Sequence, residues 1–481
     1  MELIALVRRD AYADSVALMR VSTELRALSG VVAAAAVMAT DLNREQLREA
    51  GLLTDEAAAA GAGDLLVAVR AESRAAAEAA LERAAALLAE RRAGAPTGRA
   101  IDPRSVLSAA RRAGDATLAL ISVPGPYAAA EAQAALSAGL HVFLFSDHVP
   151  LADEIGLKRR AAARGLLVMG PECGTSILGG VGLGFANRVR RGGVGLVGAS
   201  GTGLQEVTSL IHLLGGGVSH AIGTGGRDLD EAVGGLTTLQ ALEWLGRDPG
   251  TRVIAVVSKP PSAAVARRVL GAAAATGKPV IACLLGWKEA PPAPVRLVDT
   301  LDEAARSAVT ALGGTPSVLA APPAPPRSGG GVLGLYTGGS LCEEARSLVG
   351  TAGYRFDDFG SERYTRGRPH PMIDPSLRNA AVAAAGADAQ VGVLLVDVVL
   401  GDGAHADPAA ALAPAVLAAR ASADRQGRRL HVIGHVVGTD QDPQGLAAQE
   451  ARLREAGVLV CPSNRLAAEL AREIARGPDA R

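Results

Sequence analysis

The chain of 481 residues is poor in aromatic side chains, which make up 2% of it, and it carries no formal net charge at pH 7. Nucleic-acid-binding surfaces combine a basic patch with rings that stack on bases. We therefore expect no nucleic acid as a partner. No apolar run approaches the ~20 residues that a helix needs to cross a bilayer, and the first residues lack the apolar core of a signal peptide. A cytoplasmic protein without membrane contact is expected.

Cysteine is scarce as well. The four cysteines, Cys173, Cys283, Cys342 and Cys461, lie far apart and form no CxxC pair, which argues against a disulfide framework or a cysteine zinc site. The histidine and aspartate residues are too scattered to predict a metal site. Cys173 stands in a glycine-rich turn, where a small packing residue is more typical than a nucleophile.

Short apolar runs alternate with amphipathic helical patterns along almost the whole chain. This alternation is typical of parallel sheets in α/β proteins. We therefore expect an α/β fold with several Rossmann-like or flavodoxin-like parallel-sheet domains and a small N-terminal α+β domain. The predicted domains are residues 1–95, 100–190, 191–318 and 332–476. Predicted linkers cover residues 91–97 and the proline- and glycine-rich residues 319–331.

The most informative pattern is a glycine-rich turn between a strand-like run and a helical one. The turn reads Gly-Ala-Ser-Gly-Thr-Gly at residues 198–203. A strand followed by such a turn and a helix directs backbone N–H groups and the positive end of the helix dipole toward an anion. Ser200 and Thr202 add hydroxyl groups on either side of Gly201. We predict that this turn binds a phosphate or a carboxylate.

A second element of the same kind follows the long linker. A strand-like run ends in Thr-Gly-Gly-Ser, and a helical pattern begins at once, so that Gly338, Gly339 and Ser340 match the first turn. Two such helix ends in one chain suggest two lobes that face one charged group. Ordinary tight turns between strand and helix are the alternative.

A third glycine-rich loop contains Gly225 and Arg227. A guanidinium group can bind a carboxylate or phosphate through two parallel hydrogen bonds. Asp397, inside or at the end of a strongly apolar strand, can position a cation, accept a hydrogen bond or cap the next helix. We predict that these residues contribute to the same anion site.

The proline-rich segment at residues 364–378 is unlike its surroundings. It holds Arg368, His370 and Arg378, and its prolines stiffen the backbone between them. A rigid loop of this composition suits a polar anionic substrate, and a solvated surface loop is the alternative.

Six motifs together resemble the FdrA family over nearly the whole chain: GPECGTS, GLVGASGTGLQEV, AIGTGGRDL, SKPP, LYTGGSLCEEA and GRPHPMIDPSLR. FdrA-like proteins are similar to the alpha subunit of succinyl-CoA synthetase with a beta-subunit-like domain attached. The resemblance implies a CoA-binding-like domain at 100–190 and ligase-like domains at 191–318 and 332–476. In the synthetases, two helices aim their N-termini at a phosphohistidine. The matching loop at residues 286–292 contains no histidine, and the chain has no room for an ATP-grasp domain.

The resemblance implies a subunit of a carbamoyltransferase like oxamate carbamoyltransferase, which converts oxalurate and phosphate to oxamate and carbamoyl phosphate in purine and allantoin nitrogen use. The two helix ends would then hold phosphate or carbamoyl phosphate. Arg227, Arg368 or Arg378 would bind the substrate carboxylate, and His370 would transfer a proton. Other subunits of a hetero-oligomer would complete the site, and CoA is a possible ligand. The alternatives are an acyl-CoA synthetase subunit that works with a separate nucleotide-binding chain, and a non-catalytic scaffold that binds CoA or a phosphorylated metabolite.

Overall fold

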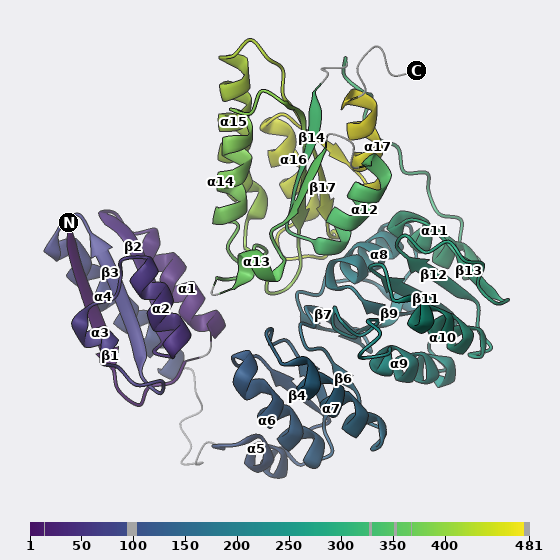
Figure 1. The fold of residues 1–481 in the computed structure, drawn as a ribbon, viewed down its shortest axis with the longest axis horizontal. Helices are drawn as coiled ribbons and strands as arrows, with labels where there is room; N and C mark the ends of the chain where they lie inside the picture. The colour runs from purple at the N-terminus through teal and green to yellow at the C-terminus, as the bar shows by residue number, and fades with distance from the viewer. Residues whose placement is uncertain (14, 94–102, 327–329, 351–353, 367, 476–481) are drawn as a thin grey trace. The chain divides into compact units, whose positions relative to one another are not determined.

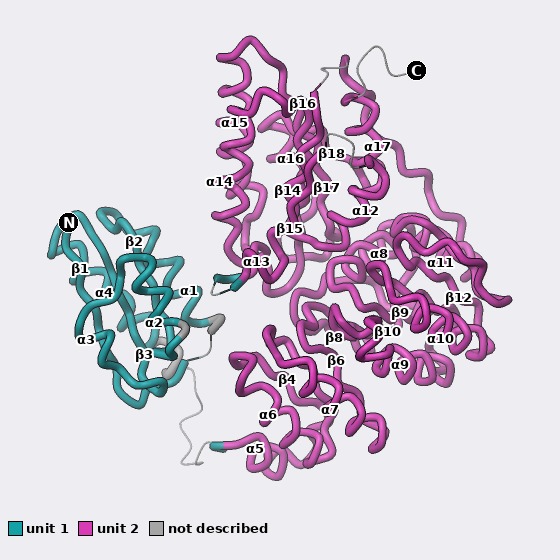
Figure 2. The backbone as a smooth tube through the Cα atoms, in the orientation of Figure 1, with its two compact units in different colours: residues 1–104, 366–369 teal, residues 105–365, 370–481 magenta. Residues whose placement is uncertain are grey.

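The computed structural model describes residues 1–481 except 14, 94–102, 327–329, 351–353, 367 and 476–481. The chain forms two compact units (Figure 2). Unit 1 is Met1–Arg104 with Arg366–Pro369, and unit 2 is Ser105–Thr365 with His370–Arg481. No helix in the described ranges is long and apolar enough to cross a membrane. The fold is α/β, as predicted.

Unit 1 contains β1 (Glu2–Arg8), α1 (Ser15–Arg26), β2 (Val31–Met38), α2 (Asp41–Glu49), α3 (Asp55–Ala58), β3 (Leu65–Ala71) and α4 (Arg74–Ala93). Its antiparallel sheet has the order β1-β3-β2 (Figure 1). Side chains alternate along β3, so Val67 and Val69 pack with α1 and α4 while Leu66 packs with α2 and α3. The predicted linker at 91–97 begins inside α4, and the rest of it lies outside the described residues.

The first domain of unit 2 has a parallel sheet in the order β4-β5-β6. Its elements are α5 (Val106–Ala113), β4 (Leu118–Ile121), α6 (Gly125–Ser137), β5 (His141–Leu144), α7 (Leu151–Ala162) and β6 (Val168–Met169). Alanines of α6 and α7 allow these helices to pack closely on the sheet.

The second domain contains β7 (Thr175–Leu178), β8 (Val181–Gly184), β9 (Arg191–Ala199), α8 (Gly201–Leu213), β10 (Val218–Gly223), α9 (Leu236–Arg247), β11 (Val253–Ser258), α10 (Ala263–Ala274), β12 (Val280–Leu284), β13 (Val295–Leu297) and α11 (Leu301–Ala311). The sheet order is β13-β12-β11-β9-β10-β7-β8. The β7–β8 hairpin therefore joins this sheet, although the sequence analysis placed it with residues 100–190. It does so because β7 pairs antiparallel with β10, with Leu178 opposite His220.

The third domain contains β14 (Gly331–Tyr336), α12 (Gly339–Val349), β15 (Arg355–Asp358), α13 (Glu362–Thr365), α14 (Ser376–Ala385), β16 (Val391–Val399), α15 (Pro408–Asp424), β17 (His431–Val437), α16 (Leu446–Glu455), β18 (Val458–Cys461) and α17 (Asn464–Ala475). Its sheet is entirely parallel, in the order β15-β14-β16-β17-β18. Every residue of β16 is buried, as expected for a parallel strand with helices on both faces.

One hydrophobic core joins the second and third domains. Helices α8 and α11 of the second domain and α12 and α17 of the third share it, with Leu204, Leu341 and Leu470 among its members. The helices lie between the two sheets (Figure 1). This packing fixes α8 relative to α12, and with them the two glycine-rich turns at their N-termini.

Candidate functional site

The first glycine-rich turn connects β9 to α8. Ser200 is the N-cap residue, and its Oγ accepts the N–H of Gly203 at 3.0 Å. The N–H groups of Gly201 and Thr202 lie in the first turn of the helix, where no carbonyl of the helix can accept them. A Cβ placed on Gly201 would lie 3.9 Å from Oγ1 of Thr175. That hydroxyl is buried and has no hydrogen-bond partner within the described chain, so several donors remain for a ligand.

The second turn connects β14 to α12, and an internal carboxylate already occupies part of it. The side chain of Asp397, on β16, accepts the N–H of Thr337 and the N–H of Gly338, each at 2.7 Å. Asp397 is fully buried. The N–H groups that this turn leaves for a ligand are therefore those of Gly339 and Ser340.

Arg378 supports Asp397 from behind. Its side chain is 2% exposed, and it donates to the backbone carbonyl of Asp397 at 2.8 Å and lies 3.6 Å from the carboxylate. Burial lowers the pKa of Arg378, and the charge of Asp397 opposes that effect. The sequence analysis assigned both residues to substrate binding. In the structure both side chains are buried, so neither can contact a substrate. Arg378 binds Asp397, and Asp397 binds the backbone of the turn.

The structure brings the two turns together. Ser200 Oγ and Ser340 Oγ lie 2.5 Å apart, across 140 residues of sequence. A Cβ placed on Gly338 would lie 3.0 Å from Cβ of Thr202, so the backbone of one turn rests against the other. The N-termini of α8 and α12 thus face a common site.

Two charged side chains border the α12 end of this site. A side chain at Gly339 would overlap Oδ2 of Asp358 and Nζ of Lys259, so glycine is what lets both groups approach the helix end. The Lys259 ammonium and the Asp358 carboxylate are 3.9 Å apart. A cavity of about 420 Å³ opens here, and Gly339, Lys259, Asp358, Arg346 and Tyr364 are among its lining residues.

His370 lies at the same edge of the third sheet. A Cβ placed on Gly360 would lie 2.8 Å from Nε2 of His370 and 3.1 Å from Oδ1 of Asp358. Its Nδ1 accepts the N–H of Met372 at 3.2 Å, which leaves the ring proton on Nε2. Burial lowers the pKa of His370 to about 4. At neutral pH the imidazole is therefore uncharged and can donate one hydrogen bond, but it holds no second proton to give.

Arg227 and Gly225 are used within the chain. Nε of Arg227 donates to Glu154 at 3.0 Å, and Nη2 donates to the carbonyl of Val149 at 2.8 Å. Both partners belong to the first domain of unit 2, so the guanidinium connects two domains. It cannot at the same time donate two parallel hydrogen bonds to a substrate carboxylate. Gly225 has φ +87°, and a Cβ there would overlap the carbonyl of Pro171.

Arg368 is exposed and belongs to the segment that groups with unit 1. Its role in substrate binding stays a prediction. Cys173 is buried, and burial raises the pKa of its thiol to about 11, as expected for a packing residue.

Three residues of this site escaped the sequence analysis or received little weight in it. Thr175 belongs to an inconspicuous short strand, and Asp358 ends the edge strand β15. Lys259 follows β11 in the SKPP motif. Lys259 directly follows a parallel strand and Asp358 ends one, and this position is a local signal because such strand ends gather at one edge of a sheet. Thr175 begins a strand that runs antiparallel to β10 and carries no such signal.

The comparisons with known proteins agree with this geometry. Residues 335–474 match the family model described as CoA-ligase, and residues 189–286 match the one described as CoA binding domain. The latter match falls on the second domain of unit 2, so a CoA-binding role for residues 100–190 stays a prediction. The chain therefore contains a CoA-binding domain and a CoA-ligase domain within an α/β fold.

The particular family follows from a relative that spans the whole chain. The chain is 38% identical to YahF of Escherichia coli K12, described as uncharacterized, over 512 residues, which cover 98% of this chain and 99% of that protein. The chain therefore belongs to the YahF family. It is also 28% identical over 183 residues to the alpha subunit of ADP-forming succinate–CoA ligase from Staphylococcus aureus Mu50, covering 37% of this chain and 58% of that subunit. A solved acetyl-coenzyme A synthetase of Ca. Korarchaeum cryptofilum aligns at 17% identity over 75% of this chain and 82% of that one, with a TM-score of 0.34.

Residues 1–103 match a family model described as AllF, heavy metal-associated domain. Soft heavy metals are bound by thiolate, thioether and imidazole groups. Residues 1–103 contain no cysteine and no histidine, so the thioethers of Met1, Met19 and Met38 are their soft donors. The described chain has no cluster of three or more His, Cys, Asp or Glu side chains that could hold a metal. This donor set lacks the thiolates and imidazoles that bind a heavy metal tightly.

We expect the intact chain to show no stoichiometric binding of Zn²⁺ or Cu⁺ in unit 1. Equilibrium dialysis followed by elemental analysis measures this. A tight one-to-one complex that remains with the fragment of residues 1–93 after limited proteolysis would contradict the expectation.

Proposed function

We propose that this protein is a subunit of an acyl-CoA-synthetase-type enzyme that transfers an acyl group between phosphate and the thiol of CoA. The reaction is acyl phosphate plus CoA to acyl-CoA plus phosphate, and it runs in both directions. The observation that carries the proposal is the contact between Ser200 and Ser340, which sets two helix N-termini against one site. The CoA-ligase and CoA-binding matches, which cover these same two domains, support it.

The phosphate group fits best at the α8 side of the site. The first-turn N–H groups of Gly201 and Thr202 and the unpartnered hydroxyl of Thr175 would favour a negative charge there. The ammonium of Lys259 approaches the common site from the α12 end. Preorganised donors of this kind also stabilise the charge that develops on the acyl oxygen in the transition state, at roughly 10²–10³ in rate for each donor.

The α12 side differs, because it carries carboxylates. Asp397 occupies two of its N–H groups, and Asp358 stands beside a third. A second phosphate would be repelled there. The neutral Nε2–H of His370 can donate to the acyl group without adding charge.

The loop that follows β12 contains no histidine, so this chain has no phosphohistidine carrier at the expected position. Phosphate would enter and leave as a free ion or as an acyl phosphate. Any nucleotide-dependent step would then belong to a partner chain. Carbamoyl phosphate is a small member of the acyl phosphate class, and the missing histidine keeps carbamoyl transfer as a second candidate function.

The test is a direct assay of the purified chain with CoA and a panel of acyl phosphates that includes acetyl, succinyl and carbamoyl phosphate. We expect phosphate release and a new thioester, identified by mass spectrometry, with at least one member. Carbamoyl transfer would instead appear as phosphate release with an amine acceptor and no thioester. An inactive chain, alone and with the proteins that co-purify with it, would overturn the proposal.

The Gly339→Ala variant should lose roughly 10–100-fold of this activity, because its methyl group displaces Asp358 and Lys259 from the helix end. Gly271→Ala is the matched control, since a Cβ at that helical glycine meets no atom within 4 Å. Initial rates of the two variants decide the point. Equal rates would mean that the α12 end does not take part.

A further inference from the structure

The proposed reaction needs a group that accepts the proton of the CoA thiol, and Asp358 lies beside the start of α12. It is the last residue of β15, opposite Tyr336 of β14, so its carboxylate emerges at the sheet edge where α12 begins. Oδ1 accepts the N–H of Gly360 at 2.9 Å. Oδ2 points at Gly339 and has no close hydrogen-bond donor among the described residues, since the ammonium of Lys259 is 3.9 Å away.

The groups that face Asp358 come from four parts of unit 2. Lys259 approaches from the loop after β11, Asp397 from β16, and Arg346 and Cys342 from α12. Nε2 of His370, in the segment before α14, lies near the same point beside Gly360 as Oδ1 of Asp358. Burial raises the pKa of Asp358, and Lys259, the Gly360 N–H and Arg346 work against that effect while Asp397 adds to it. The side chain is still 19% exposed in the cavity, so a substrate can reach it.

Two other groups at this edge can be excluded as the base. Asp397 is fully buried, and its oxygens are taken by Thr337 and Gly338. His370 receives a hydrogen bond at Nδ1, so its only free nitrogen is the one that carries the proton.

Glu343 and Asp357 also line the cavity, but Glu343 accepts a hydrogen bond from Arg346 at 2.8 Å and Asp357 accepts one from the Tyr364 hydroxyl at 3.3 Å. Asp358 is the carboxylate of this cavity that lies against Gly339 at the start of α12.

We propose that Asp358 exchanges the proton of the nucleophile in this reaction and that anion binding at the helix ends is coupled to its protonation. The inference rests on the proposed function. In the direction of thioester synthesis, the CoA sulfur forms a bond to the acyl carbon, the carbon–oxygen bond to phosphate breaks, and the electron pair leaves on phosphate. The thiol proton moves to Oδ2 of Asp358 and from there to the departing phosphate, which leaves as the hydrogen phosphate dianion. In the reverse direction, Asp358 takes the proton from the attacking phosphate and gives it to the departing thiolate.

The coupling follows from charge. An ionised Asp358 beside Gly339 opposes a dianion at the same helix ends, and a neutral one does not. Binding of a dianion at the helix ends and uptake of a proton by Asp358 therefore favour each other.

The coupling can be measured without turnover. Inorganic sulfate, whose charge stays constant over the range, serves as the probe in calorimetric titrations of the intact chain from acidic to mildly alkaline pH. We expect the wild type to bind sulfate about tenfold more weakly once Asp358 is ionised. Asp358→Asn should bind with nearly constant affinity, and it keeps an oxygen for the Gly360 N–H.

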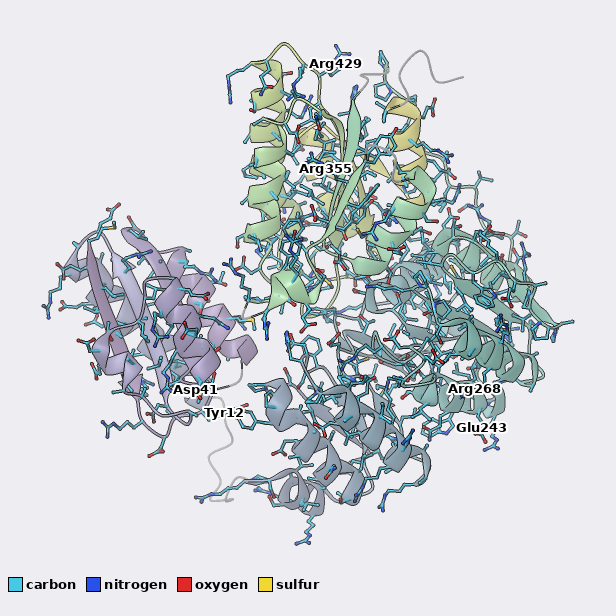
Figure 3. The ribbon with its side chains drawn as sticks, viewed as in Figure 1. Tyr12, Asp41, Glu243, Arg268, Arg355 and Arg429 are labelled. Carbon is cyan, nitrogen blue, oxygen red and sulfur yellow. The ribbon has the colours of Figure 1, made fainter. Side chains whose placement is uncertain are left out.

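The matched control is Glu243→Gln, which removes one negative charge from α9 on the outside of the second domain (Figure 3). It should keep the pH dependence of the wild type. Proton uptake by the wild type, obtained from titrations in buffers of different ionisation enthalpy, gives a second measurement that needs no variant.

The outcomes separate the two proposals. If Asp358→Asn keeps the wild-type pH dependence, or if sulfate binds to the wild type without proton uptake, Asp358 is not coupled to the anion and the inference fails while the proposed function stands. If the wild type binds no sulfate at any pH, the anion site itself fails, and the proposed function with it. In the acyl transfer assay, Asp358→Asn should lose about 10² in rate together with the rise of rate with pH that a carboxylate base produces.

Discussion

Asp397→Ala should lower the free energy of unfolding by about 3–5 kcal/mol and reduce acyl transfer to the background rate. The carboxylate accepts two backbone N–H groups at 2.7 Å and lies beside the buried guanidinium of Arg378. Removal of the carboxylate leaves two buried donors unsatisfied and one buried charge without its partner, and such losses are among the costliest in a protein core. The turn before α12 also loses the group that fixes its backbone.

Urea denaturation measures the stability change, and Asp299→Ala is the control. Asp299 forms an exposed ion pair with Lys288 at 2.8 Å, and exposed pairs contribute about 0–1 kcal/mol. Asp397→Asn should fall between the two, because its amide keeps one oxygen for the turn. A loss in Asp397→Ala no larger than in the Asp299 control would show that the turn does not depend on Asp397.

Most of the local structure at this site could be predicted from the sequence, because it depends on residue patterns that extend over a few neighbouring residues. Strand, glycine-rich turn and helix follow one another within a few residues, so the turns at Ser200 and Gly338 could be identified from the sequence. Their shared role in anion binding stays a prediction. The contact between Ser200 and Ser340 then follows from the packing of α8 against α12.

The roles of the charged residues could not be predicted in the same way, because burial and partners come from distant parts of the chain. Arg378 stands in a proline-rich stretch that resembles a surface loop, yet it is buried against Asp397. Arg227 stands in a glycine-rich loop that suits an anion, yet Glu154 holds it. In the sequence, nothing distinguishes Asp358 from other acidic residues at strand ends. Its proximity to Gly339 arises only from the fold.

A buried network beneath the two helices carries the second large prediction. Glu206 on α8 lies 2.7 Å from Nε2 of His435 on β17, and Nδ1 of the same ring is 3.0 Å from the carbonyl of Cys461. All of these groups are buried. The pair therefore connects the second domain to the third within their shared core.

Glu344 on α12 extends this network. Asn464 donates one N–H to Glu344 at 2.7 Å, and its backbone N–H reaches Glu206 at 3.3 Å. Burial raises the pKa of Glu344 to about 7, and the charge of Glu206 adds to that effect. Helices α8 and α12, whose N-termini form the proposed anion site, are thus anchored through one set of buried polar groups. We expect substitutions in this network to disturb the proposed site as well.

Glu206→Ala should destabilise the protein by about 3–5 kcal/mol, because it leaves His435 buried without its carboxylate. The loss should depend on pH. Burial lowers the pKa of His435, but Glu206 and the Cys461 carbonyl outweigh it and raise the pKa above its usual value. The stabilisation by the pair is therefore fully present below the unfolded pKa of histidine and disappears as the pH rises through the higher folded value.

Denaturation curves of the wild type and Glu206→Ala across neutral pH test this directly, and their difference should shrink toward alkaline pH. The double variant Glu206→Met/His435→Leu separates the charge from the packing. If the cost of the single substitution is an uncompensated buried charge, apolar side chains of similar volume should recover most of the stability. If the double variant is as unstable as the single one, the network stabilises the fold through its packing rather than through its charges. A stability difference between wild type and Glu206→Ala that does not change with pH would support the same conclusion, because the pH dependence of this pair comes from the protonation of His435.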